Sequence, residues 1–343
     1  MAQKRPATKK KIDLALQGGG AHGAFTWGVL DCLFEDDRLE IEAISGTSAG
    51  AMNAVVAADG MMDDGHDGAR QALRHFWKSV SVAALTSPLK RTFYDVLVGN
   101  WNLDYSPGYH FSDFLARLAS PYELNPMNLN PLKDFLADNV NFERVRACDK
   151  MKLFLAATCV QTGMVRIFER AELTPDVVMA SACLPTFYQA VSIDGQDYWD
   201  GGYAGNPPLY PFAYRCQAAD VLLVQINPVF RQETPKSAGE IMNRINEITF
   251  NANLLHELRA IDFVDRMLDE GSLDPNRYKK IYIHAIQTGE RFKHLNASSK
   301  LNAEWDFLIH LHDIGQQAAQ AWLAQHFDDI GQRSTLDLHA LLH

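Results

Sequence analysis

Apolar runs and helically spaced apolar residues follow one another near the start of the chain. The run at residues 12–17 is typical of a buried strand and leads into a glycine-rich stretch at residues 18–23. Apolar side chains then recur with a helical period until the acidic residues 35–37. The pattern therefore predicts a strand, a glycine-rich loop and a helix in succession.

A second apolar run, residues 39–45, again predicts a strand, and small helix-forming residues begin at Ala49. The segment from Gly46 to Gly50 therefore falls on the turn between a strand and a helix. Farther along, alternating and apolar runs predict two hairpins, two more buried strands and two helices. The hairpins are expected at residues 152–168 and 190–199, the strands at 220–226 and 280–286, and the helices at 174–181 and 302–327.

A capping box formed by Ser237 and Glu240 predicts the start of a further, long helix. Its apolar residues keep close to helical spacing, so one face of this helix is expected to lie in the core. These residues are Ile241, Ile245, Ile248, Leu255, Leu258 and Ile261.

Residues 61–130 differ from the rest of the chain. A loop is predicted at residues 61–68, after which aromatic side chains accumulate and prolines break the segment into short helices and loops. An insertion of this kind beside an active site is a candidate lid or acyl-chain wall. A helical layer that covers the sheet explains the same pattern, and the two interpretations do not exclude each other.

The length and composition favour one large folded unit. The chain has 343 residues, of which 47% are hydrophobic, and neither an internal repeat nor a long linker divides it. We therefore expect a three-layer α/β/α protein with a mostly parallel central sheet. Its parts are a basic, disordered tail at 1–11, a catalytic core at 12–230 that contains the insertion at 61–130, and a C-terminal region at 231–343 with helices and one further strand, packed on the core.

Charge and cysteine content exclude several classes of protein. A formal net charge of −10 argues against a general role on nucleic acid. The five cysteines are scattered, which indicates reduced thiols rather than disulfides or a metal site. No stretch has the pattern of a secretory signal or of a membrane span, so we expect a cytoplasmic protein. Any membrane contact is then peripheral and comes from a local patch, with the basic tail as one alternative source.

The turn at Gly46-Thr47-Ser48-Ala49-Gly50 has the context of a nucleophile elbow, which is a G-x-S-x-G sequence between a strand and a helix. Such a turn holds the Ser48 side chain clear of the backbone, and a Cβ at either flanking glycine would clash with the strand or the helix. The helix N-terminus then favours negative charge near Ser48. A glycine- and serine-rich turn without chemistry is the alternative.

The glycine-rich loop, Gly18-Gly19-Gly20-Ala21-His22-Gly23, can offer backbone N–H groups to an oxyanion or a phosphate. It lacks the lysine and Ser/Thr of a P-loop and the spacing of a dinucleotide fingerprint, so nucleotide binding is the weaker interpretation. A tight turn without chemistry is the other alternative. Acyl transfer needs a serine and a separate set of donors, and this favours the oxyanion role.

Ser48 needs a proton acceptor within hydrogen-bond reach. The late histidines, His284 in the last predicted strand among them, have no distinctive loop context and are expected to be structural or exposed. Asp200 ends a predicted strand and is followed by Gly201 and Gly202, which allow other groups to approach it closely. Asp200 is therefore the better candidate, and a turn aspartate without chemistry remains the alternative.

Four motifs in this order resemble the patatin-like phospholipase family: Gly18 to Gly23, Gly46 to Gly50, Ala180 to Pro185, and Asp200-Gly201-Gly202. The similarity extends from residue 12 to about residue 210. It implies a patatin-like fold and a lipid acyl hydrolase that cleaves carboxylic esters of lipids or phospholipids with a Ser48–Asp200 dyad, without histidine, metal or cofactor. It also implies an oxyanion hole formed by Gly18, Gly19, Gly20, Ala21, His22 and Gly23, and an acyl pocket bordered by residues 181–185.

His22 departs from the family pattern, which usually has Arg or Lys at this position. At neutral pH a histidine carries that charge only in part, so a preference for anionic phospholipids does not follow from the resemblance. The same dyad also serves acyltransferases and polyester depolymerases, and a catalytically silent lipid-binding regulatory module is a further alternative. The partner expected in each case is a lipid or another acyl ester.

Overall fold

The computed structural model describes residues 9–342. The basic tail predicted for residues 1–11 thus lies outside the described residues except for its last three. Strand β1 (Lys10–Leu16) starts two residues before the predicted beginning at Ile12. Lys10 and Lys11 belong to it because they pair in parallel with Leu39 and Glu40 of β2 (Leu39–Gly46).

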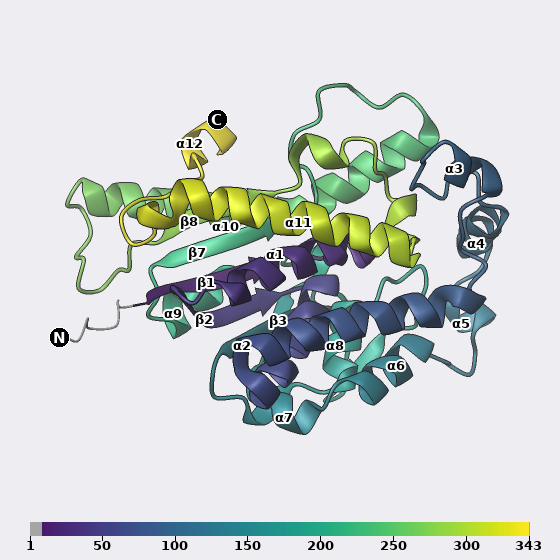
Figure 1. Ribbon diagram of the computed structural model, residues 1–343, viewed down its shortest axis with the longest axis horizontal. Coiled ribbons are helices and arrows are strands. Elements are labelled where there is room, and N and C mark those ends of the chain that lie inside the picture. Colours follow the sequence, from purple (N-terminus) through teal and green to yellow (C-terminus); the bar gives the residue numbers. More distant parts are fainter. Residues whose placement is uncertain (1–8, 343) are drawn as a thin grey trace, which may run out of the picture.

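A single eight-stranded sheet forms the centre of the protein (Figure 1). Strands β1, β2, β3 (Lys152–Cys159), β7 (Asp220–Gln225) and β8 (Tyr282–Gln287) form its parallel part. Strands β4 (Val165–Glu169), β5 (Val191–Ile193) and β6 (Gln196–Asp200) pair antiparallel, in agreement with the two predicted hairpins. The sheet is therefore mostly parallel, as predicted.

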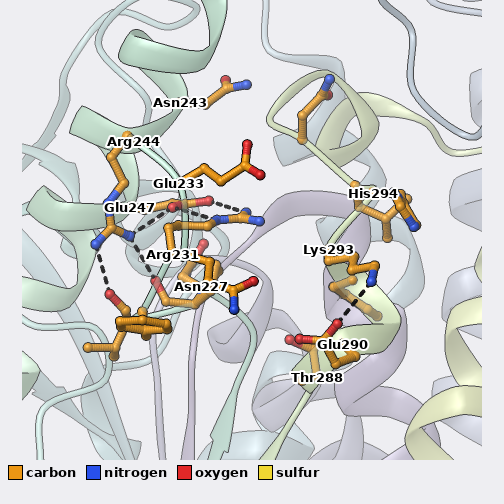
Figure 2. A pocket seen from close by; sticks show the side chains of 18 of the residues that line it. Asn227, Arg231, Glu233, Asn243, Arg244, Glu247, Thr288, Glu290, Lys293 and His294 are labelled. Atoms are coloured by element: carbon orange, nitrogen blue, oxygen red, sulfur yellow. Dashed lines mark hydrogen bonds and ion pairs between the residues drawn. The ribbon is translucent and has the colours of Figure 1, made fainter. Parts of the chain in front are cut away.

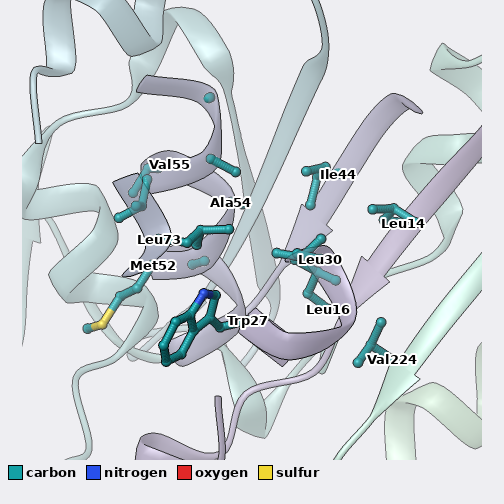
Figure 3. Packing of buried hydrophobic residues seen from close by; sticks show 14 of the residues in the cluster. Leu14, Leu16, Trp27, Leu30, Ile44, Met52, Ala54, Val55, Leu73 and Val224 are labelled. Atoms are coloured by element: carbon teal, nitrogen blue, oxygen red, sulfur yellow. The ribbon is translucent and has the colours of Figure 1, made fainter. Parts of the chain in front are cut away.

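Helices cover both faces of the sheet and produce a three-layer α/β/α arrangement. The side chains of β1 alternate between two cores: Leu14 and Leu16 face one, and Ala15 faces the other. The first core contains α1 (Gly23–Glu35), α2 (Ala49–Ala83) and α11 (Trp305–His326), and Figure 3 shows Trp27 and Leu30 of α1 packed there. The second contains α9 (Tyr210–Arg215) and α10 (Ala238–Asp269).

The remaining elements are short. The helices are α3 (Phe93–Leu97), α4 (Pro107–Leu118), α5 (Pro121–Leu124), α6 (Pro131–Asn139), α7 (Phe142–Ala147), α8 (Pro175–Ser181) and α12 (Leu338–Leu342). The 3₁₀ turns are η1 (Gly20–His22), η2 (Ala84–Thr86), η3 (Arg170–Glu172), η4 (Gly201–Tyr203), η5 (Gly289–Phe292), η6 (Ser298–Leu301) and η7 (Phe327–Asp329). Figure 1 places α3, α4 and α5 together at the end of the sheet toward which the parallel strands run.

The loop predicted at residues 61–68 is present only as a short turn. The span labelled α2 consists of two helices that meet at Asp64 and Gly65, whose backbone is not helical, and Gly65 has a φ of 58°. The two helices approach closely, since a Cβ on Gly68 would collide with the carbonyl oxygen of Gly60. The turn-forming residues of this segment therefore separate two helices that pack against each other.

The capping box of α10 is present as predicted, but its first half does not contribute to the core. Ile241, Ile245 and Ile248 are 41%, 48% and 54% exposed, whereas Leu258 is buried. The apolar face of α10 packs on the sheet only in its second half. In the described part of the chain, residues 9–342, no helix has both the length and the apolar character that crossing a bilayer requires.

Candidate active site

Ser48 occupies a strained turn between β2 and α2. β2 ends at Gly46, α2 begins at Ala49, and Ser48 has a φ of 54° and a ψ of −120°, a conformation that a side chain with a Cβ rarely adopts. Hydrogen bonds hold it there: the Ser48 N–H donates to Ser181 Oγ at 2.9 Å, and the Thr47 hydroxyl donates to the Gly205 carbonyl at 2.7 Å. The strained geometry is that of a nucleophile elbow.

The flanking glycines of this turn lie where no side chain fits. A Cβ on Gly46 would be 2.7 Å from the backbone carbonyl carbon of Gly50. A Cβ on Gly50 would collide with the carbonyl oxygen of Leu16 in β1. Both glycines thus allow α2 to start directly against the strands, and this sets the position of Ser48.

The pairing along β3 explains why Asp200 lies next to Ser48. β4 pairs with one edge of β3, so β2 and β6 share the other edge. On that edge β2 runs toward β6 and ends at Gly46, opposite Leu155, while β6 ends at Asp200, opposite Ala157. The two strands therefore meet end to end, and the residues that follow them face each other.

Asp200 is held rigidly and is almost completely buried, with 1% of its surface exposed. Its Oδ1 accepts a 2.7 Å hydrogen bond from the Gly202 N–H, and its backbone N–H donates to the Cys183 carbonyl at 2.8 Å. Burial raises the pKa of Asp200 to about 7, although hydrogen bonds from Gly202 and from the Ser48 hydroxyl favour its ionised form. Asp200 therefore lies beside Ser48 and has a pKa suited to proton transfer near neutral pH.

Gly201 and Gly202 leave room for close packing around this carboxylate. A Cβ on Gly201 would collide with the carbonyl oxygen of Ala156, in the middle of the shared edge of β3. A Cβ on Gly202 would collide with the ring of Phe250, which reaches the site from α10. The C-terminal region thus covers the carboxylate side of the site.

The glycine-rich loop runs against Ser48. A Cβ on Gly18 would be 2.8 Å from Ser48 Cβ, and the Gly18 N–H donates to Asn206 Oδ1 at 2.7 Å. The His22 N–H donates to the Gly19 carbonyl, and the Gly23 N–H to carbonyls within the same turn. The remaining backbone donors of the loop belong to Gly19, Gly20 and Ala21.

His22 is buried in surroundings that favour its neutral form. Its Nε2 lies 2.8 Å from Ser299 Oγ, and its ring packs edge-on against Phe292. Burial lowers the pKa of His22 well below its usual value, and the charge of Lys300 acts in the same direction. His22 is therefore neutral at physiological pH, so it does not carry even part of the charge considered for this position.

Two residues of the site have no signal in the local sequence. Ser181, at the end of α8, anchors the backbone of Ser48, whereas the segment that contains it was expected only to border an acyl pocket. Lys300, in η6, lies near Asp200, and its charge favours the ionised form of that carboxyl. Neither contact follows from spacing or periodicity, because each joins segments far apart in the chain.

His284 is structural, as expected. Its Nε2 lies 3.0 Å from Asp220 Oδ1 and its Nδ1 lies 3.0 Å from Thr335 Oγ1. One ring nitrogen thus joins β8 to β7, and the other joins it to the segment between η7 and α12. Among the residues that the structure describes, no three His, Cys, Asp or Glu side chains are grouped so that they could hold a metal ion.

Figure 2 shows a cavity of about 990 Å³, whose lining residues include neither Ser48 nor Asp200. Its walls come from the segment after β7, the first half of α10 and the segment after β8. Glu247 forms ion pairs there with Arg231 at 2.6 Å and with Arg244 at 3.0 Å. Asn227 connects the cavity to the glycine-rich loop, because it lines the cavity and donates from Nδ2 to the Gly18 carbonyl at 3.0 Å.

Comparison with known proteins relates this site to one family. Residues 14–213 match the sequence model of the patatin-like phospholipases. A curated relative, the uncharacterized protein YjjU of Escherichia coli K12, is 26% identical over 235 residues, which cover 68% of this chain and 56% of the relative. The chain thus spans little more than half the length of that relative.

Solved structures of bacterial proteins are more distant. VipD from Legionella pneumophila is 15% identical, with 90% of this chain and 67% of that chain covered at a TM-score of 0.37. ExoU, in its complex with SpcU from the type III secretion system of Pseudomonas aeruginosa, is 14% identical, with 95% and 53% covered at a TM-score of 0.39.

Proposed function

This chain belongs to the patatin-like phospholipase family, and from that premise we propose that it is a lipid acyl hydrolase with Ser48 as nucleophile and Asp200 as base. The observation that carries the proposal is the position of the Ser48 hydroxyl beside the buried Asp200 carboxyl, whose ionised form it favours, at the junction of β2 and β6. A serine next to a proton acceptor, on a strained elbow, is the arrangement that nucleophilic catalysis requires.

The reaction begins when Ser48 Oγ attacks the carbonyl carbon of an ester. Its proton passes to Asp200, and the carbonyl oxygen becomes an oxyanion as the new C–O bond forms. Collapse of this tetrahedral intermediate breaks the bond to the alcohol, which leaves with the proton from Asp200. Water then attacks the acyl-serine with the same base, which releases the fatty acid and restores Ser48.

The oxyanion donors in this proposal are the N–H groups of Gly19, Gly20 and Ala21. The other donors predicted in the loop, at Gly18, His22 and Gly23, already bind acceptors of the protein itself. Preorganised donors of this kind contribute about 3 to 4 kcal/mol each to transition-state stabilisation.

We also propose that α3, α4 and α5 meet the lipid surface from which the substrate comes. Many of their apolar side chains are exposed, among them Phe93 at 84%, Leu97 at 72% and Met127, just after α5, at 79%. The segment lies beside the site, since the Gln189 side chain donates to the Asn125 carbonyl at 2.6 Å and the Ala190 N–H to the Tyr122 hydroxyl at 3.2 Å. The segment thus exposes apolar side chains that a lipid surface can accept, and it lies at the same end of the sheet as Ser48 and Asp200.

Labelling with a fluorophosphonate probe tests the proposal without knowledge of the natural substrate. We expect mass spectrometry to locate the label on Ser48, and the label to be absent from Ser48→Ala. Unlabelled wild-type protein would favour the silent lipid-binding module instead. Product analysis with an added lysophospholipid or thiol acceptor separates a hydrolase from an acyltransferase, and a polyester film tests the depolymerase alternative.

A further inference from the structure

A turn of the C-terminal region packs against the glycine-rich loop. Gly20 has a φ of 58°, and a Cβ on it would lie 2.5 Å from the carbonyl oxygen and 3.4 Å from the Cβ of Lys300. Next to it, Ser299 binds His22. This turn, η6, lies beyond residues 14–213, the part of the chain that matches the family. The loop is therefore completed by a segment that the family match does not include.

The Lys300 side chain reaches the loop through a single bridge. Its Nζ donates to Asn227 Oδ1 at 2.6 Å, and Asn227 Nδ2 donates to the Gly18 carbonyl at 3.0 Å. Asn227 is itself fixed, since it is buried and its backbone N–H donates to Gln17 Oε1 at 2.7 Å. Asn227 thus links the ammonium group of Lys300 to Gly18, the residue that packs against Ser48.

The titratable groups around Lys300 come from four different segments of the chain. Glu247 of α10 and Asp200 of β6 attract its positive charge, whereas Arg231 repels it. His22 of η1 faces it as well and is held neutral. Burial lowers the pKa of Lys300 to about 8, so the ammonium form still predominates at neutral pH.

Asp200 has few other charged neighbours. Burial, and after it the Asp200 charge, raises the pKa values of Cys183 and Tyr203 to about 12, so each is neutral at physiological pH. Lys300 is the group whose positive charge favours ionised Asp200. Its influence is smaller than that of burial or of the hydrogen bonds from Gly202 and Ser48.

We propose that Lys300 is a positioning residue of the Ser48–Asp200 site: through Asn227 it ties the glycine-rich loop to the C-terminal region, and it places a positive charge near Asp200. The inference rests on the proposed function of Ser48 and Asp200. It gives the C-terminal region a part in catalysis, because a group that supports the glycine-rich loop comes from residues outside the family match.

The test compares the pH dependence of kcat/KM for a soluble acyl ester in wild type and in Lys300→Met. The acid limb of this profile is the part in which activity falls as pH decreases. The neutral methionine should move this limb to higher pH by about half to one pH unit, a smaller shift than the loss of a charge in direct contact would cause. Lys300→Arg retains the charge and should return the limb toward the wild-type position. An unmoved limb in a folded Lys300→Met protein would overturn the inference and leave the dyad intact.

Lys279→Met is the matched control. Lys279 is also partly buried and has a lowered pKa caused by burial, but it lies before β8, where its Nζ donates to the carbonyls of Phe212 and Cys216. The loss of a partly buried lysine in general would affect both variants, whereas the inference expects the acid limb to move only in Lys300→Met. Thermal unfolding of each variant verifies that it is folded.

A second readout does not depend on activity. The carboxyl carbon of Asp200 can be followed by carbon-13 NMR and assigned through its disappearance in Asp200→Asn. Its titration should move to higher pH in Lys300→Met and not in Lys279→Met, and an unchanged titration would refute the electrostatic role. If wild type hydrolyses no ester, the proposed function fails, while this titration still decides whether Lys300 acts on Asp200.

Discussion

The backbone N–H of Ser48 donates a 2.9 Å hydrogen bond to the hydroxyl of Ser181. This bond joins the end of α8 to the strained residue of the elbow. Because Ser48 has a positive φ, it keeps this conformation only where its surroundings hold it. Ser181 is thus part of the support that orients Ser48, the nucleophile of the proposed reaction.

Ser181→Ala should therefore slow the enzyme without removing any reacting group. Loss of one buried hydrogen bond of about 1 kcal/mol predicts a drop in kcat of about five- to tenfold. The rate of labelling by a fluorophosphonate should fall by a similar factor. Ser192→Ala, which changes an exposed serine of β5, is the control. A wild-type labelling rate in Ser181→Ala would show that the bond does not position Ser48.

The pH dependence of activity follows from the environment of Asp200. Burial raises the pKa of Asp200 to about 7, and only the ionised form can accept the proton of Ser48. We expect kcat/KM to decrease about tenfold for each pH unit below that value. A profile that stays flat down to pH 5, measured on an uncharged ester, would contradict this assignment.

The environment of Asp13, a residue of β1, predicts that the stability of the protein depends on pH. It is fully buried, its side-chain oxygens have no hydrogen-bond partner in the described residues 9–342, and burial raises its pKa to about 7 from an ordinary value of 3.8. The folded state thus binds a proton that the unfolded state releases between these values, so the contribution of Asp13 to stability is largest below pH 3.8 and is lost as pH rises toward 7. The full difference corresponds to about 4 kcal/mol.

Asp13→Asn should remove this contribution. The unfolding free energy, measured by denaturant titration between pH 4 and pH 8, should decrease less with pH in the variant than in wild type. Acid unfolding through other carboxylates affects both proteins equally and cancels in the difference. Parallel curves for the two proteins would show that Asp13 is ionised in the folded state.

The exposed apolar side chains of α3 allow a test of the proposal that this part of the protein meets a lipid surface. Phe93→Ser combined with Leu97→Ser should weaken binding to phosphatidylcholine vesicles about tenfold, since two side chains no longer enter the interface. Hydrolysis of a short, soluble ester should not change. Tyr214→Ser is a matched control, because Tyr214 is 81% exposed but lies on α9. Equal vesicle binding by all three proteins would exclude this surface.

The parts of the site that depend on local sequence could be predicted. The change from a strand pattern to a helix pattern around Gly46 to Gly50 indicates the elbow, and the strand end at Asp200 is visible in the same way. Their proximity could be inferred only from the family resemblance. It depends on β2 and β6 sharing one edge of β3, and strand register over such a distance has no local signal.

The errors have a common physical origin. A helical period shows that α10 has an apolar face, but it does not show whether another element covers Ile241 or Ile248. Asp64 and Gly65 do form a turn, yet close packing of the two helices within α2 makes this turn shorter than the predicted loop. Lys300 was missed because a lone lysine in an irregular segment gives no indication that it reaches a distant loop.

The most direct measurement of the central claim is the hydrolysis of a series of chromogenic acyl esters, from short to long chains, by wild type, Ser48→Ala and Asp200→Asn. We predict activity in wild type and its loss in both variants, with thermal unfolding showing that both are folded. The chain length that gives the highest rate would then define the acyl pocket. Hydrolysis by Ser48→Ala or Asp200→Asn at the wild-type rate would contradict the Ser48–Asp200 dyad.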